Sequence, residues 1–176
     1  VRVLDDLSTG TAANLAEVEN EISFIRGDIR DGKVTDAAVE GVEVVFHEAA
    51  LPSVPKSVAQ PIMTNSVTVG RTLPVLESCR HAGVRRLVYA ASSSAYGDTK
   101  VLPKDETLSA SPQSPYALQK YTGEVYCELY QKLFGLETVS LRYFNIFGPR
   151  QDPKSAYAAV IPSFVSAAIA GQPPTI

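Results

Sequence analysis

The sequence predicts an α/β protein built on a parallel, doubly wound sheet. Two observations carry this prediction. Short β-branched runs recur along the chain and end at turn residues, and amphipathic segments of helical length separate the later runs. Alternating strands and helices favour parallel strands joined by helical crossovers. With 176 residues, of which 45% are hydrophobic, the chain is long enough to bury one good core.

Each element is justified by its own pattern. The expected strands cover residues 1–4, 24–25, 42–47, 87–90 and 138–143. Two helices are expected over 62–81 and 115–134, because Gly83 and Gly135 fall where C-terminal caps are expected. Apolar positions at helical spacing are expected to face the core: Val69, Leu73, Leu76 and Cys79 in the first helix, and Ala117, Tyr121, Val125, Leu129 and Leu133 in the second.

Composition argues against several classes of protein. A formal charge of -3 provides no basic surface for nucleic acid, and no apolar run reaches the ~18 residues of a membrane span. Cys79 and Cys127 both lie on expected helices, which favours reduced, buried thiols in a cytoplasmic protein. His47 and His81 do not form a ligand spacing, so no metal site is predicted.

A serine cluster and a Tyr/Lys pair are the strongest signs of chemistry. Ser92, Ser93 and Ser94 end an apolar run, and Tyr116 and Lys120 follow, four residues apart. Residues at this spacing share a helix face, so the Lys120 ammonium is expected to lower the pKa of Tyr116 for acid–base work. Ser92 could hydrogen-bond the same reacting hydroxyl. The alternative is a core aromatic beside a solvated charge, with the serines forming a turn.

Acidic and small residues follow the first three strands. In a dinucleotide-binding fold, a carboxylate at the end of the second strand accepts hydrogen bonds from the adenosine ribose. Asp5 is a carboxylate at a strand end of this kind, although its strand is the first in this chain, and Ser8 and Gly10 belong to the turn after it. The other candidates are Asp28 after the next strand, and Ala49 and Ala50, which would allow a flat cofactor to approach the backbone. Ordinary turn residues and close helix packing are the alternatives.

Taken in order, these motifs resemble the extended short-chain dehydrogenase/reductase family. Within it the chain is similar to the NAD-dependent nucleotide-sugar 4-epimerases, above all the UDP-N-acetylglucosamine 4-epimerases. The resemblance rests on the motifs beginning at Val3, Gly27, Phe46, Ser92, Ser114, Leu141 and Arg150. It implies a Rossmann-like fold, bound NAD, a UDP-sugar substrate, and epimerisation at carbon 4 through a 4-keto intermediate.

The resemblance also implies roles for individual residues. Tyr116 would move the proton of the 4-hydroxyl, Lys120 would hold the nicotinamide ribose, and Ser92 would assist. Further contacts to NAD would come from Ile29 and Tyr143. The implied substrate-binding residues are Ser53, Ser92, Ser93, Ser94, Asn145, Ala159, Val160 and Phe164.

Related activities predict different residues. Nucleotide-sugar 4,6-dehydratases resemble this chain but carry an Asp-Glu pair within the serine cluster, whereas Ser93 and Ser94 stand there in this chain. The hydroxyl cluster therefore favours oxidation at carbon 4 followed by return of the hydride, and not elimination of water. Two alternatives stay open: a catalytically silent dinucleotide or nucleotide-sugar binding module, and an oxidoreductase that releases NADH.

The chain departs from this family at its ends and in one helix. It opens on what resembles the second strand, so the first strand, glycine-rich turn and first helix are expected to be missing, together with most of the C-terminal substrate lobe. Residues 1–148 are expected to be a partial NAD-binding domain, and 149–176 the start of that lobe. Thr68 replaces a common Asn.

Three expectations follow for assembly and activity. The parent enzyme should be a homodimer that pairs its helices near 62–81 and 115–134. The isolated chain should be poorly soluble or partly unfolded, and its structure should show either a gap where the first strand belongs or a rearranged sheet. It should bind NAD weakly and be inactive.

Overall fold

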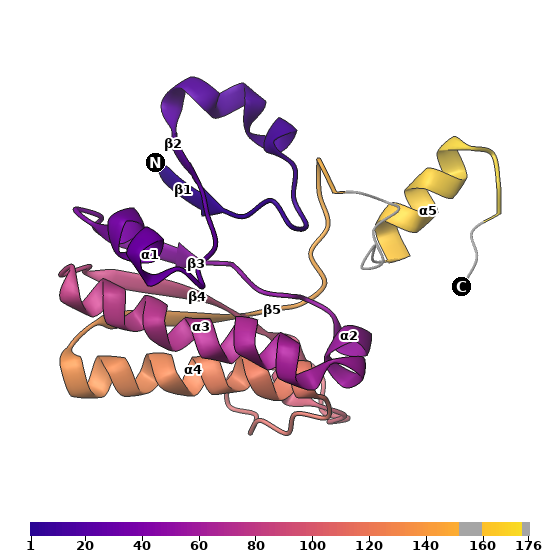
Figure 1. Cartoon of the computed structure of the whole chain (residues 1–176). Helices are drawn as coiled ribbons and strands as arrows, with labels where there is room; N and C mark the ends of the chain where they lie inside the picture. Colours follow the sequence, from indigo (N-terminus) through magenta and orange to yellow (C-terminus); the bar gives the residue numbers. More distant parts are fainter. Residues whose placement is uncertain (152–159, 174–176) are drawn as a thin grey trace. The chain divides into compact units, whose positions relative to one another are not determined.

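A computed structural model describes residues 1–151 and 160–173 (Figure 1). Contacts divide the chain into two units, Val1–Arg142 and Tyr143–Ile176. The first unit holds almost all of the regular structure, and the second contains helix α5, Val160–Ile169. The functional boundary expected at residue 148 stays a prediction.

The strands of the first unit lie in two separate sheets. Strands β1 (Arg2–Asp5) and β2 (Ser23–Arg26) pair in parallel. The second sheet has the order β3-β4-β5, with β3 at Val44–His47, β4 at Arg86–Ser92 and β5 at Glu137–Tyr143. β3 and β4 are parallel, so the α/β fold with parallel sheets is confirmed.

The break between the sheets falls where a gap was expected. In a doubly wound sheet of order 3-2-1-4-5-6, the first strand lies between the second and the fourth. Here β1 and β3 correspond to those two neighbours, and within the described residues no strand joins them. The facing edges of β1 and β3 are therefore left without a ladder partner.

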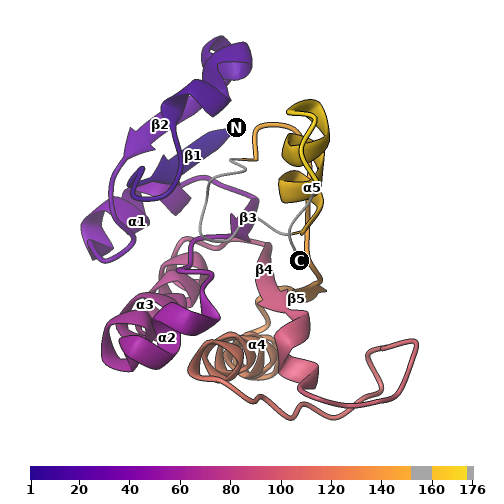
Figure 2. The same cartoon turned by 90° about the vertical axis from the view of Figure 1, so that its right-hand side faces the viewer.

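Two long helices cover one side of the β3-β4-β5 sheet, and Figure 2 shows them side by side. They are α3, Pro61–His81, and α4, Pro115–Phe134, as the sequence predicted. Gly135 ends α4 in the left-handed conformation at φ 72°, and Gly83 follows α3 at φ 69°. The shorter helices were not predicted: α1 (Gly32–Val39), α2 (Val54–Ala59), and the 3-10 turns η1 (Ala12–Glu21) and η2 (Ser93–Tyr96).

The main core lies between α3, β4 and α4. Its most buried members are Leu76, Cys79, Leu87, Tyr89 and Cys127. Both cysteines are free and buried, as expected. Burial raises the pKa of Cys79 to about 12 and that of Cys127 to about 11, so both stay as unreactive thiols near neutral pH.

The face of α4 that enters the core differs from the predicted one. Val125, Leu129 and Leu133 are exposed, although the sequence placed them in the core. Ala117 is buried as predicted, and the other buried residues of this helix are Gln119, Lys120, Gly123, Cys127 and Tyr130. Small residues on the buried face let α4 approach β4 closely. Helical spacing alone could not distinguish two stripes that both repeat every three or four residues.

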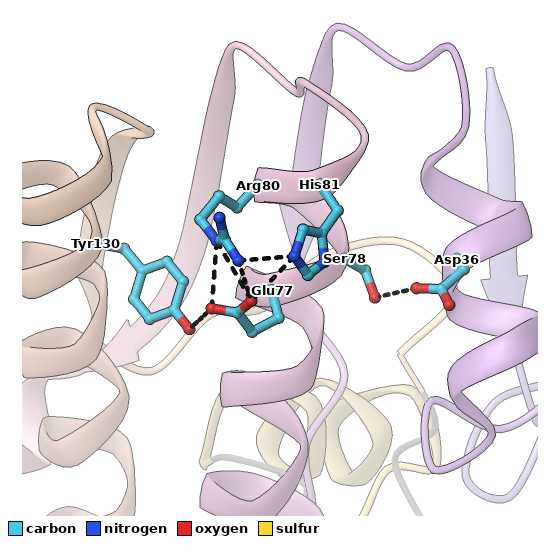
Figure 3. A network of polar contacts seen from close by, with 6 residues as sticks. All are labelled: Asp36, Glu77, Ser78, Arg80, His81 and Tyr130. Carbon is cyan, nitrogen blue, oxygen red and sulfur yellow. Dashed lines mark hydrogen bonds and ion pairs between the residues drawn. The ribbon is translucent and has the colours of Figure 1, made fainter.

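A polar network ties α3 to the helices on either side of it (Figure 3). The Tyr130 hydroxyl of α4 donates to the Glu77 carboxylate of α3, which also accepts from Arg80 Nη2 at 2.7 Å. The Ser78 hydroxyl donates to Asp36 of α1 at 2.5 Å. Hydrogen bonds from Arg80, followed by that from Tyr130, lower the pKa of Glu77 to about 2. The carboxylate is therefore charged at neutral pH.

Candidate active site

The carboxyl ends of β1, β2 and β3 surround a cavity of about 230 Å³. Six of the predicted cofactor residues line it together: Asp5, Ser8, Asp28, Ile29, Ala49 and Ala50. The lining also includes residues the sequence did not single out, namely Leu4, Asp6, Thr9, Gly27, Arg30, Leu51, Met63 and Val67. Met63 and Val67 lie one turn apart on α3, a spacing that could have indicated a shared face. Gly10 is not among the lining residues.

Carboxylates in this cavity also hold their own turns. Asp5 Oδ1 accepts from the Leu7 backbone N–H at 2.6 Å, and Leu7 has a positive φ of 58°. Asp28 accepts from Arg30 Nε at 2.5 Å and from the Arg30 backbone N–H at 2.7 Å. The Arg30 side chain holds the pKa of Asp28 below its usual range, against the effect of burial. The turn interpretation and the cofactor interpretation are thus both compatible with this geometry.

The serine cluster begins where β4 ends. The Ser92 hydroxyl oxygen accepts from the Ser94 backbone N–H at 3.2 Å and from the Ser94 hydroxyl at 2.8 Å. The Ser92 side chain also lies close enough to the Tyr116 hydroxyl to favour its ionised form. The fold therefore brings together two groups that are separated by 24 positions in the sequence.

Tyr116 lies in the first turn of α4, which Ser114 caps by accepting from the Ala117 backbone N–H at 3.1 Å. A contact the sequence did not reveal fixes this turn further. The Tyr116 backbone N–H donates to Ser57 Oγ of α2 at 3.0 Å, and the Ser57 hydroxyl donates to the Val54 carbonyl oxygen at 2.7 Å. No local sequence signal marks Ser57, since the contact depends on how α2 packs against α4.

Lys120 is buried one turn beyond Tyr116. Its ammonium donates to the Ala90 carbonyl oxygen of β4 at 2.6 Å. Burial lowers the pKa of Lys120 to about 8, and the Glu48 carboxylate opposes that shift. The ammonium is therefore turned toward β4, two residues before Ser92.

One expectation about Tyr116 is wrong in this structure. Its pKa lies above the ordinary tyrosine value, because burial disfavours the phenolate and the nearby Ser92 side chain offsets only part of that effect. Lys120 was expected to lower this pKa, but its ammonium is engaged with Ala90. Sharing a helix face was thus not enough to make the cation a partner of the phenol.

The remaining predicted substrate residues lie in different parts of the chain. Ser53 is buried and caps α2, where its hydroxyl oxygen accepts from the Lys56 backbone N–H at 3.0 Å. Asn145, Val160 and Phe164 belong to the second unit, as does Tyr143, which was expected to contact NAD. Ala159 lies outside the described residues.

Comparison with known proteins identifies the family. The family described as "Epimerase: NAD dependent epimerase/dehydratase family" matches residues 1–176. The chain belongs to this family of NAD-dependent epimerases and dehydratases. Since the family uses NAD, the strand-end cavity can be tested against that cofactor. Its carboxylates suit ribose hydroxyls, and its two alanines leave room for a flat ring, so the residues fit the adenosine end.

Members of the epimerase/dehydratase family resemble the whole chain. A putative UDP-glucose 4-epimerase of Methanocaldococcus jannaschii is 39% identical over 178 residues, covering 100% of this chain and 57% of that protein. A UDP-N-acetylglucosamine 4-epimerase from Methanobrevibacter ruminantium M1, solved with UDP-N-acetylmuramic acid, has a TM-score of 0.94 at 38% identity. The UDP-glucose 4-epimerase of Thermus thermophilus, solved with NAD, has a TM-score of 0.89 at 37% identity. The chain covers 57% of each of these two structures and is itself covered completely.

Two features are absent from the part of the chain that the structure describes. Among residues 1–151 and 160–173, no helix is both long and apolar enough to cross a membrane. Over the same ranges, no three His, Cys, Asp or Glu side chains gather where they could hold a metal ion.

Proposed function

We propose that the protein containing this chain epimerises carbon 4 of a UDP-sugar, of the UDP-N-acetylglucosamine or UDP-glucose type, through a 4-keto intermediate. The observation that carries the proposal is the placement of the Ser92 hydroxyl close enough to the Tyr116 phenol to favour its ionised form, one helical turn from the buried ammonium of Lys120. A phenol, a hydroxyl and an ammonium at the end of one strand suit proton transfer at a sugar hydroxyl. The similarity to 4-epimerases supports this assignment.

In this proposal the chain's own residues bind the substrate and move a proton. Bound NAD supplies the chemistry of accepting a hydride from carbon 4 and returning it. Tyr116 exchanges a proton with the oxygen on carbon 4, and the Ser92 hydroxyl holds that oxygen in place. Lys120 binds the nicotinamide ribose. Ser53, Ser93, Ser94 and Asn145 are proposed to contact the sugar diphosphate, and Ala159, Val160 and Phe164 the uridine.

The serine cluster supports epimerisation over dehydration. Elimination of water needs an acid and a base beside the sugar, and no carboxylate stands among Ser92, Ser93 and Ser94. An oxidoreductase that releases NADH and a silent binding module are the rival functions. Residues Ser92, Tyr116 and Lys120 argue against the silent module, because binding alone does not require them.

Product analysis tests this assignment. The full-length protein is incubated with UDP-glucose or UDP-N-acetylglucosamine, and NMR of the anomeric protons is recorded alongside absorbance at 340 nm. The 4-epimer should accumulate to equilibrium without net NADH. A 4-keto-6-deoxy sugar would point to dehydration, and accumulating NADH to an oxidoreductase. Absence of any change with both substrates, in the presence of NAD, would favour the silent module.

We further propose that the parent protein is a homodimer through α3 and α4. An apolar stripe reaches the surface along each helix: Ile62 with the partly buried Val69 and Leu73 on α3, and Leu118, Val125, Leu129 and Leu133 on α4. A groove of about 520 Å³ lies between the first turns of the two helices. Ile62 is 86% exposed and Leu118 54%, which is costly in water unless a partner covers them. A second copy would supply two matching helices.

Activity is proposed to need more than this chain. The chain spans about 57% of the curated relative and structures it matches, so their remaining segments have no counterpart in it.

The free thiols Cys79 and Cys127 support a reducing compartment, and we propose the cytoplasm.

A further inference from the structure

Gly123 occupies an unusual place in α4. It lies in the interior of the helix, where glycine is less stable than alanine because it loses more backbone freedom on folding. A Cβ atom at this position would lie 2.2 Å from Tyr89 Oη, 2.5 Å from Cζ and 2.9 Å from Cε1. Real Cβ atoms essentially never approach below 3.0 Å. A side chain at position 123 and the present position of the Tyr89 ring are therefore mutually exclusive.

The ring that fills this space belongs to the middle of β4. Tyr89 is 1% exposed, so it has no room to move into solvent. Its hydroxyl donates to the Lys120 carbonyl oxygen at 3.4 Å, a long hydrogen bond. The ring also lies 5.7 Å from the His47 ring of β3, centroid to centroid. Tyr89 therefore has neighbours on both α4 and β3.

The same ring faces the Lys120 ammonium. Lys120 Nζ lies 5.2 Å from the centroid of the Tyr89 ring, within the range of a cation–π contact. The Ala90 carbonyl oxygen accepts from the same nitrogen at 2.6 Å. A buried ammonium needs such partners, and adjacent residues of β4 provide both. The other ionisable groups around it are Glu48 and His47 at the end of β3 and Tyr116 on its own helix.

We propose that Gly123 and Tyr89 are positioning residues for Lys120. The absent side chain at position 123 creates the slot for the Tyr89 ring, and the ring forms the wall against which the Lys120 side chain is aligned on Ala90. Both act through Lys120 and neither touches the substrate. The relevance to catalysis rests on the function proposed above, whereas the geometric claim concerns the chain alone.

The test measures the ionisation of Lys120 directly. The full chain is labelled with ¹³Cε-lysine and titrated by NMR, and the signal of Lys120 is assigned by its absence from Lys120→Met. Gly123→Ala should raise the pKa of Lys120 from about 8 by roughly one unit, because the displaced ring admits water to the ammonium. Tyr89→Leu should have the same effect, and Tyr89→Phe, which keeps the ring, should not.

Gly70→Ala is the matched control. Gly70 also lies inside a long helix, but a Cβ there would meet only the Asn65 carbonyl oxygen at 3.6 Å. This variant should be at least as stable as wild type and leave the titration of Lys120 unchanged. The double variant Gly123→Ala with Tyr89→Leu should recover the melting temperature lost in Gly123→Ala without restoring the pKa, which separates packing from positioning.

Each outcome decides the proposal. A Lys120 pKa that stays at the wild-type value, or falls, in a folded Gly123→Ala variant overturns it. If Gly123→Ala does not fold, Tyr89→Leu decides in the same way. No step of this test uses NAD or a sugar nucleotide. A positive titration in a protein that proves to have no epimerase activity would therefore refute the proposed function and leave the positioning role intact.

Discussion

The Lys120 ammonium donates a 2.6 Å hydrogen bond to the Ala90 carbonyl oxygen, and this bond joins the second turn of α4 to the C-terminal half of β4. Ser92 lies two residues further along the same strand and close to Tyr116, which precedes Lys120 by one turn on the same helix. Both members of the Tyr/Lys pair therefore lie against the last residues of β4. Five predictions test this arrangement and its surroundings.

Tyr116→Phe should abolish most of the turnover of the full-length protein. The substitution keeps the ring and removes the hydroxyl that exchanges the proton, so kcat should fall by roughly two to four powers of ten while KM changes little. Steady-state kinetics with a UDP-sugar provide the measurement. Tyr121→Phe, on the same helix, is the matched control and should retain activity. Near wild-type turnover by Tyr116→Phe would show that the acid–base assignment is wrong.

His47→Gln should make the protein less sensitive to acid. His47 is buried, and its Nε2 lies 3.1 Å from Thr72 Oγ1, whose own proton goes to the Thr68 carbonyl oxygen at 2.7 Å. His47 must therefore donate from Nε2 as a neutral ring. Burial, followed by repulsion from Lys120, lowers its pKa from 6.5 to about 4.

The sign of the effect follows from proton binding. Between pH 6.5 and about 4 the unfolded chain binds a proton that the folded chain does not, so stability falls as pH falls, by up to about 3 kcal/mol. Chemical denaturation at a series of pH values should show this loss in wild type and a flatter profile in His47→Gln. His81→Gln, at an exposed position, is the control. If the stability of His47→Gln falls between pH 6.5 and about 4 as much as that of wild type, the prediction is wrong.

Glu77→Gln should weaken the attachment of α3 to α4. The carboxylate accepts from both Arg80 and Tyr130, and these bonds lower its pKa to about 2. Its stabilising effect is present above the ordinary Glu pKa and is lost as pH falls toward 2. The melting temperature of Glu77→Gln should therefore be lower than wild type at pH 7, and the difference should disappear near pH 2.

Glu128→Gln serves as the control for that network. Glu128 pairs with Lys132 at 2.5 Å on the same helix, but both side chains are more than 60% exposed. Exposed pairs of this kind contribute little to stability, so this melting temperature should stay close to wild type. Equal losses of melting temperature in Glu77→Gln and Glu128→Gln would mean that the contact between α3 and α4 stabilises the protein no more than an exposed ion pair does.

Leu118→Glu should convert the proposed dimer to monomer. Leu118 lines the groove between α3 and α4 and belongs to the exposed apolar stripe of α4. A carboxylate buried against a second copy would lack a partner, and its desolvation would disfavour association. Light scattering of the full-length protein should give a dimer for wild type and a monomer for the variant. Phe46→Glu, which changes an exposed residue of β3, controls for the added charge and should remain dimeric. If the wild-type protein is a monomer at micromolar concentration, the proposed dimer is wrong.

The isolated 176-residue chain should bind NAD more weakly than micromolar. The cavity at Asp5 and Asp28 fits an adenosine, but the sheets that carry its walls are not joined by strand pairing among the described residues. The walls can therefore shift relative to one another, and ordering them would reduce the binding free energy. Calorimetric titration of a monodisperse sample is the measurement. Micromolar affinity would show that the two sheets already form a competent site.

The sequence by itself determined the order of the strands and the two long helices, the limits of those helices and most of the site candidates. The signals for these features come from residues that are close in the sequence, namely β-branched runs, glycines at helix ends and short motifs. Asp5, Asp28 and Ala49 were recognisable because parallel strands place their carboxyl ends at one edge, where the cavity is found. The short helices α1 and α2 were missed because six to eight residues give too little periodicity.

Only the tertiary structure decided which face of α4 is buried and where the Lys120 ammonium points. The exposed apolar stripe and the buried face of that helix repeat at similar spacing, and the choice between them depends on the shape of β4. The helix approaches that strand where Gly123 makes room for Tyr89, so Leu129 faces outward and Lys120 faces inward. The hydrogen-bond partner of Lys120 is the backbone carbonyl oxygen of Ala90. Every residue carries such an oxygen, so the sequence does not show which one the Lys120 ammonium will reach.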